Sequence, residues 1–127
     1  MLPLRYPWLW LLLGAALVAL VIAGSVLSFS LETVEVPLLD KWVHAGSYLV
    51  LMLWFSGLYR RQWHIVVGLL LFLMGLALDL VQSVLPYRMF DVNDIAANGA
   101  GILLGLVAAR FVFEGWCRRF EQLIFSR

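Results

Sequence analysis

The chain has 127 residues, of which 64% are hydrophobic and only 13% are charged, and its formal net charge is +1. Soluble domains carry about 25% charged residues, so this composition excludes a soluble domain and indicates an integral membrane protein. The few basic residues argue against nucleic-acid binding. The single cysteine, Cys117, excludes an intramolecular disulfide and a cysteine-based zinc site.

The first predicted element is a membrane-spanning helix at residues 8–27, a stretch without a charged residue. About 20 apolar residues are enough to cross the hydrocarbon core of a bilayer. Trp8 and Trp10 stand where an aromatic belt meets the membrane surface. A cleaved signal peptide is the alternative, but its apolar region would be shorter, about 7–15 residues. We therefore expect an uncleaved helix.

Further apolar segments predict helices at residues 41–59, 64–85 and 94–113. Asp40 is well placed to cap the first of these helices, and Pro86 ends the second. The tail at 114–127 mixes apolar and basic residues, a pattern typical of an amphipathic helix at the membrane interface. The chain is therefore predicted to be one all-α domain, residues 1–127, with a four-helix transmembrane bundle and a C-terminal amphipathic interfacial helix.

Charge placement predicts how this bundle is oriented. Arginines flank one set of helix ends and acidic residues flank the other: Arg5, Arg60, Arg61, Arg110, Arg118, Arg119 and Arg127 against Glu32, Glu35, Asp40, Asp91 and Asp94. Lys41 and Arg88 are the exceptions. Because arginine and lysine are retained on the cytoplasmic side, we expect a multi-pass protein of the cytoplasmic membrane with both termini in the cytoplasm. Gln62 and His64, next to the basic turn, are expected at the cytoplasmic interface.

Polar residues gather near the outward ends of the last three predicted helices. Successive helical residues are about 100° apart, so each of the following groups shares one helix face. The groups are Lys41, His44 and Tyr48; Asp79 and Gln82; and Asp94 and Asn98. Polar groups that faced lipid would be costly, so these faces are expected to turn toward one another. The pattern predicts an outward-facing polar pocket, with Arg88 and Asp91 in the loop beside it.

Asp79 is the most informative residue of this group. It lies about six residues inside its helix, which is roughly 9 Å of depth at about 1.5 Å per residue. At that depth it must pair or take up a proton, and the candidate partners are Lys41, His44 and Arg88. A structural clamp and a functional site are equally consistent with this position.

The other polar residues each have two interpretations. Arg88 offers a planar guanidinium that grips a phosphate or carboxylate, or else it pairs with Asp91 or Asp94. His44 is suited to shuttle protons or to act as a ligand, but we expect it to be structural and to donate a hydrogen bond to Asp79 or to a backbone carbonyl. Asn98 is suited to bridge two helices through its amide. No metal-ligand spacing is present, so neither a metal nor another cofactor is predicted, and no catalytic residue is assigned.

Two glycines predict close helix packing. Gly101 and Gly105 form a GxxxG pattern, which lets the backbones of two membrane helices approach each other. The pattern serves either packing within one chain or a contact between two copies in a homo-oligomer.

Three stretches carry a resemblance to a known family. They read Asp40-Lys41-x-x-His44-x-x-x-Tyr48, then Asp79-x-x-Gln82, then Pro86-x-Arg88-x-x-Asp91-x-x-Asp94-x-x-x-Asn98-x-x-Gly101-x-x-x-Gly105. On these residues the chain resembles the VanZ-like family of bacterial membrane proteins, which is named for a low-level teicoplanin resistance determinant. The family usually has Glu where this chain has Asp79, and often Phe where it has Ala45. The carboxylate is thus kept but sits one methylene back.

Three functions fit these observations. The first is a non-enzymatic protein whose pocket binds a membrane lipid or lipid-linked envelope precursor and alters glycopeptide susceptibility. The second is a structural or partner-recruiting membrane subunit. The third, ranked last, is a small membrane enzyme in which Asp79 and His44 do acid–base work on a lipid phosphate or ester held by Arg88. No nucleophile with an adjacent base is evident, since Ser83 and Tyr48 are weak candidates.

Overall fold

The computed structural model describes the chain at residues 3–26, 39–84, 92–111 and 115–125; within these ranges, the side chains of 25–26, 39–41, 82–83, 92–94 and 125 are not described. The elements are α1 (Pro7–Val26), α2 (Leu39–Leu58), the short 3-10 helix η2 (Arg61–Trp63), α3 (His64–Ser83), α4 (Val92–Phe111) and α5 (Trp116–Phe125). The described part of the chain is all-helical, which confirms the predicted all-α class. Each α-helix begins and ends within two residues of its predicted range.

Two of these helices are long and apolar enough to cross a membrane, over Pro7–Gly24 of α1 and over Arg61–Val81, which includes most of α3. Together, α4 and α5 make a third span only if they are counted as one segment across the 52° bend between them, and α2 offers a shorter apolar stretch, Trp42–Leu58. The chain is thus a membrane protein, with two or three crossings supported by length and composition. A crossing by all four helices stays a prediction, because the apolar stretch of α2 is shorter than those of α1 and α3, and α4 reaches the length of a span only together with α5.

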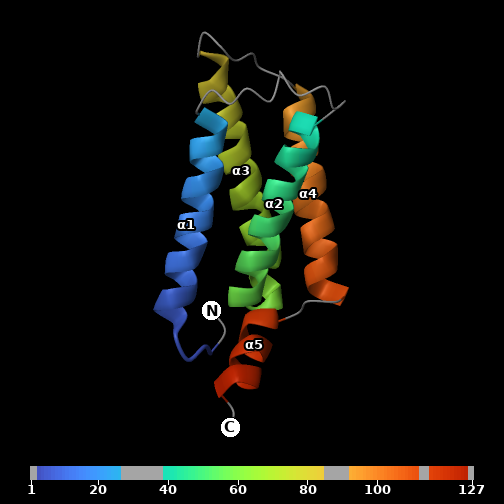
Figure 1. Ribbon diagram of the computed structural model, residues 1–127. Coiled ribbons are helices and arrows are strands. Elements are labelled where there is room, and N and C mark those ends of the chain that lie inside the picture. The colour runs from blue at the N-terminus through green and yellow to red at the C-terminus, as the bar shows by residue number, and fades with distance from the viewer. Residues whose placement is uncertain (1–2, 27–38, 85–91, 112–114, 126–127) are drawn as a thin grey trace.

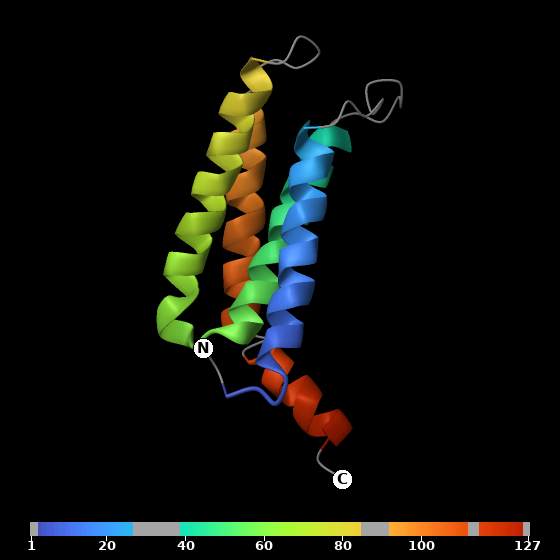
Figure 2. The ribbon, with the colours of Figure 1, turned by 90° about the vertical axis from the view of Figure 1, so that its left-hand side faces the viewer.

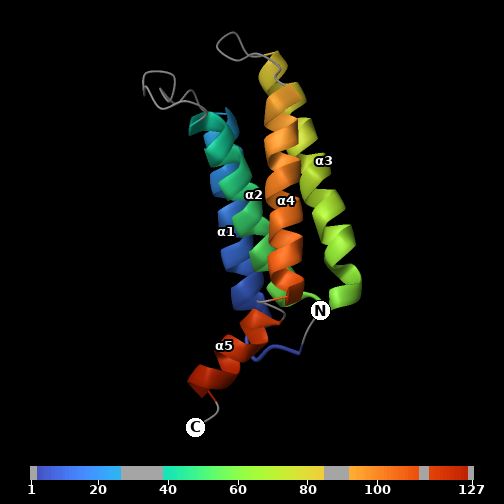
Figure 3. The ribbon, with the colours of Figure 1, turned by 90° about the vertical axis from the view of Figure 1, so that its right-hand side faces the viewer.

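Helices α1 to α4 lie side by side, and α5 packs under one end of them (Figures 1 and 2). Figure 3 shows the order α1, α2, α4, α3 across the bundle. The start of α1, the end of α2, the start of α3 and the end of α4 all lie at the end where α5 packs. We call this the α5 end, and the opposite end the distal end. Among the described residues, six arginines belong to the α5 end: Arg5, Arg60, Arg61, Arg110, Arg118 and Arg119.

The pair α2 and α4 makes the most extensive contact in the described bundle. Glycines of α4 allow it: a Cβ added at Gly101 would collide with the backbone carbonyl oxygen of Ala45, and one added at Gly105 would lie 2.7 Å from Cβ of Met52. Because only a hydrogen occupies the side-chain position, the two backbones come close together, as small residues allow in membrane helices.

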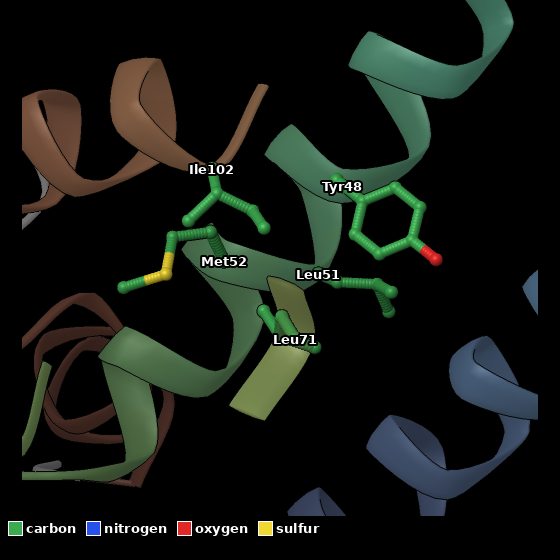
Figure 4. Close-up of a cluster of buried hydrophobic side chains, with 5 residues drawn as sticks. All are labelled: Tyr48, Leu51, Met52, Leu71 and Ile102. Carbon is green, nitrogen blue, oxygen red and sulfur yellow. The ribbon is translucent and has the colours of Figure 1, made fainter. Parts of the chain in front are cut away.

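The apolar core lies between α2, α3 and α4. Tyr48, Leu51 and Met52 of α2 pack with Leu71 of α3 and Ile102 of α4, and all five are buried (Figure 4). The outer surfaces of the helices instead expose large aliphatic side chains, as expected where lipid rather than water surrounds a bundle. The core therefore holds α2 between its neighbours at mid-bundle, and it fixes the polar residues found one or two turns nearer the distal end.

Candidate functional site

Polar side chains from three helices meet near the distal end of the bundle. Tyr48 of α2, Asp79 of α3 and Asn98 of α4 are only 2%, 2% and 3% exposed. His44, one turn before Tyr48, lies 3.1 Å from the Asn98 side chain, measured from Nδ1 to Oδ1. We call these four residues the distal polar cluster. Such a group within apolar helices is costly to bury, so its members need one another or a ligand.

The α3 backbone closes one side of this cluster. A Cβ added at Gly75 would lie 2.8 Å from Nδ2 of Asn98 and 3.1 Å from the Tyr48 hydroxyl. The amide and the phenol therefore rest directly on α3, one turn before Asp79. Glycine at position 75 is thus what lets α2 and α4 bring polar groups up to Asp79.

The contact between His44 and Asn98 joins α2 to α4 through side chains. Oδ1 of Asn98 only accepts hydrogen bonds, so Nδ1 of His44 carries the proton and donates it. The predicted bridging role of Asn98 is therefore observed, with His44 as its partner. The expected hydrogen bond from His44 to Asp79 or to a backbone carbonyl stays a prediction.

Several predicted site residues lie wholly or partly outside the described part of the chain. The backbones of Lys41, Gln82 and Asp94 lie in α2, α3 and α4, but their side chains are not described, and Arg88 and Asp91 lie outside the described residues altogether. The predicted pairing of Asp79 with Lys41, His44 or Arg88 and the pocket itself stay predictions. In the described ranges, no three His, Cys, Asp or Glu side chains are grouped to hold a metal ion.

Comparison with protein families shows to which family this chain belongs. The VanZ/LLP1 family matches residues 3–113, which include all of α1 to α4. The chain belongs to the VanZ/LLP1 family. A relative in the fission yeast Schizosaccharomyces pombe, "Uncharacterized protein C11E3.10", is 33% identical over 117 residues, which cover 89% of this chain and 70% of the relative. No solved structure matches the chain.

The VanZ/LLP1 match ends before α5, and a second buried polar site lies there. Glu121 of α5 is 6% exposed. Its Oε1 accepts a hydrogen bond from the backbone N–H of Arg5 at 2.6 Å, and its Oε2 accepts from the N–H of Tyr6 at 3.1 Å and from the indole of Trp10 at 2.9 Å. One carboxylate thus ties α5 to the segment that leads into α1. Sequence reasoning missed this role, although an acidic residue one turn after Cys117 on an apolar helix face was a usable signal.

Aromatic side chains surround this carboxylate. The ring of Trp10 lies 5.4 Å from that of Trp54, 5.5 Å from Trp116 and 5.8 Å from Phe120, between ring centroids, which is the range of favourable tilted and edge-to-face contacts. The indole of Trp54 donates to the Trp10 carbonyl at 3.2 Å, and that of Trp116 to the Leu53 carbonyl at 2.6 Å. The indoles therefore lock α1, α2 and α5 together.

Charge and burial set the titration of two groups in α5. Burial raises the pKa of Glu121, but the hydrogen bonds from Arg5, Trp10 and Tyr6 and the charge of Arg5 outweigh it, so the pKa is lowered overall. Burial, and then the negative charge of Glu121, raise the pKa of Cys117 to about 12. Glu121 is therefore ionised near neutral pH, and Cys117 is a protonated, covered thiol rather than a nucleophile.

His64 was expected at the membrane interface, but the structure buries its side chain inside the protein. It is only 1% exposed, and its Nε2 lies 2.8 Å from the Ser56 carbonyl oxygen and 3.1 Å from that of Tyr59. Both oxygens are acceptors, so Nε2 carries the proton and donates to the last turn of α2, where carbonyls lack helical partners. Within the described residues, Nδ1 has no hydrogen-bond partner. His64 thus closes the turn between α2 and α3 from inside the protein.

Proposed function

We propose that this VanZ/LLP1 protein is a non-enzymatic membrane protein whose distal polar cluster binds the headgroup of a membrane lipid or lipid-linked envelope precursor. The observation that carries the proposal is the convergence of Tyr48, Asp79 and Asn98, all nearly fully buried, from three helices of an apolar bundle. Ionisable groups at membrane depth are rare and usually mark ligand or ion sites. The cluster lies near one end of the bundle, at the depth where a headgroup would enter.

The distribution of charge supports an outward-facing distal polar cluster. The six arginines of the α5 end would stay in the cytoplasm, so the distal end would face outward from the cytoplasmic membrane of a bacterium. Binding there would change access to envelope precursors and thereby glycopeptide susceptibility. A relative in a fission yeast supports a phospholipid headgroup, which bacteria and fungi share, over a ligand found only in bacterial walls.

A structural network is the second candidate, and one observation favours it. The His44–Asn98 contact of 3.1 Å and the close approach of Asn98 and Tyr48 to Gly75 show that the described part of the cluster is already well packed. In this case the polar groups would specify how α2, α3 and α4 pair, as buried polar residues do in other helical assemblies.

The two candidates differ in the effect of Asp79→Asn. Protein is extracted in discs of native membrane, moved to detergent, and the lipids that stay bound are identified by mass spectrometry, with the apparent Tm measured in parallel. A headgroup site predicts that Asp79→Asn loses the retained lipid while membrane level and apparent Tm are kept. A structural network predicts a lower level and Tm. The control is Ser47→Ala, which removes a hydroxyl whose hydrogen bond within the described residues goes to the Val43 carbonyl of its own helix.

Arg88 supplies a second arm of the same experiment. Arg88 is expected to bind the anionic part of the headgroup. The Arg88→Ala variant should therefore also lose the retained lipid while its protein level in the membrane is unchanged. If Arg88→Ala keeps both the retained lipid and the protein level in the membrane, Arg88 does not bind the headgroup. If the parent protein retains no specific lipid, the headgroup proposal is rejected and the structural network is the better account.

A further inference from the structure

The second half of α5 exposes an apolar strip that the bundle covers only in part, through the contact of Trp10 with Phe120. Phe120, Leu123 and Ile124 are 48%, 78% and 50% exposed. At about 100° per residue they lie on one side of the helix, the side that also carries Trp116 and Cys117 one or two turns earlier. We call Phe120, Leu123 and Ile124 the α5 strip. Exposed groups of this size beside polar residues mark a surface that meets a partner or a membrane.

The first half of α5 fixes the direction in which this strip points. Cys117 is fully buried, the Trp116 indole donates to the Leu53 carbonyl at 2.6 Å, and a Cβ added at Gly57 of α2 would collide with the Trp116 indole nitrogen. The apolar side of α5 is therefore turned toward the ends of the membrane helices. Because α5 then runs out past the bundle (Figures 2 and 3), the same side meets the surroundings of the bundle in its second half.

Large apolar side chains are exposed on the bundle as far as the α5 end. Trp8 at the start of α1 and Phe111 at the end of α4 are 64% and 80% exposed, so the lipid-facing surface of the bundle reaches the α5 end. A helix that extends from that end with its apolar side turned toward the bundle lies with this side in the leaflet. Its other side faces the headgroups and water, as in interfacial amphipathic helices.

The charge beside the strip selects the kind of lipid. Arg119 lies one turn before Leu123, next to the strip, and it is exposed, whereas Arg118 projects from the opposite side of the helix. Glu121, the acidic residue of α5, is buried and accepts hydrogen bonds from the backbone N–H groups of Arg5 and Tyr6. It projects about 200° around the helix from Arg119, so its carboxylate faces away from that arginine. We propose that the α5 strip inserts into the leaflet at the α5 end and that Arg119 there binds the headgroup of an anionic phospholipid.

The test uses the full chain in vesicles with a fluorophore on Gln122→Cys. Gln122 is exposed and projects between Arg118 and Arg119 around the helix axis. Vesicles contain phosphatidylcholine and phosphatidylglycerol, with a headgroup spin label on either one as the quencher. One arginine near a membrane surface contributes about fivefold to anionic binding at moderate salt. We therefore expect about fivefold preferential quenching by phosphatidylglycerol, lost in Arg119→Gln and in high salt, and largely kept in the matched control Arg118→Gln. The parent chain gives the background labelling of buried Cys117.

Each other outcome overturns the proposal. Equal quenching by both lipids would leave the strip in the membrane but without anionic selectivity. Absence of quenching by either lipid, while a fluorophore at exposed Ile65 at the start of α3 is quenched, would place the strip in water or on a protein. Self-quenching between labelled copies that disappears on dilution with unlabelled chain would identify a second copy as the occupant. The site lies at the opposite end from the distal polar cluster, so its failure leaves the proposed function unaffected.

Discussion

Glu121 shows how one side chain can hold distant parts of this chain together. Its two oxygens accept three hydrogen bonds from the segment Arg5–Trp10. In Glu121→Gln, the new NH2 group would face N–H donors and the charge would be lost. Because hydrogen bonds to charged groups contribute about 1.5–3 kcal/mol, we expect a loss of about 2–3 kcal/mol of stability, measured as a lower apparent Tm in detergent. The neighbouring control Gln122→Ala, at an exposed position, should shift the Tm little.

The same carboxylate gives the stability a defined pH dependence. Its pKa in the folded protein is below its ordinary value of 4.5, so the unfolded chain binds the proton more readily. The contribution of Glu121 is thus complete above pH 4.5 and is lost as the pH falls through the lowered pKa of the folded state. The Tm difference between parent and Glu121→Gln should shrink over that acidic interval. A difference that does not depend on pH would contradict the ionised-carboxylate interpretation.

Single residues were predictable from sequence only where the alternatives were few. A polar amide on an apolar helix, such as that of Asn98, is expected to hydrogen-bond to a side chain of another helix. The structure shows this contact, with His44 as the partner. The roles of Glu121 and His64 could not be read in the same way. The donors to Glu121 come from residues more than 110 positions away, and the acceptors of His64 are main-chain carbonyls of the preceding helix, so both depend on how the helices pack.

At the scale of helices, the contact between α2 and α4 depends on glycine. In Gly101→Ala, the methyl group would meet the Ala45 carbonyl, a backbone atom that moves only if the helices separate. In the matched control Gly99→Ala, the nearest atom is Cε2 of Phe72 at 3.5 Å, an ordinary contact. We expect Gly101→Ala to cost about 1–3 kcal/mol or more and Gly99→Ala less than about 1 kcal/mol, from thermal unfolding in detergent. Equal tolerance of the two variants would show that α2 and α4 pack less closely than described.

The helices themselves follow from local sequence. Long apolar runs, Pro86 and the polar residues before α4 set helix ends to within two residues. An amphipathic pattern in the tail also predicted α5. What the pattern could not give is the side to which α5 turns, because this depends on where Trp116 and Cys117 find partners in α2. Local hydrophobic periodicity determines that a helix forms, whereas tertiary contacts determine what it covers.

At the scale of the whole molecule, the arrangement of charges gives the bundle two different ends. Arginines that are far apart in sequence are brought to the α5 end by the up-and-down course of the helices (Figure 1). The distal polar cluster lies at the other end. This polarity could be read from the sequence because alternating helix ends return to the same side. The side of the membrane on which each end lies is a separate question, since no contact within the bundle depends on it.

The orientation can be tested by cysteine labelling, but not through the native thiol. Cys117 is fully buried and its pKa is raised to about 12, first by burial and then by Glu121, so it should react with maleimide only after denaturation. Added cysteines are needed: Glu32→Cys in the segment between α1 and α2, and Gln122→Cys on the exposed side of α5. With both termini cytoplasmic, an impermeant maleimide should label position 32 in intact cells or spheroplasts and position 122 only after permeabilisation. The reverse pattern would place the distal polar cluster at the cytoplasmic leaflet, and an envelope precursor exposed on the outer leaflet could then no longer be its ligand.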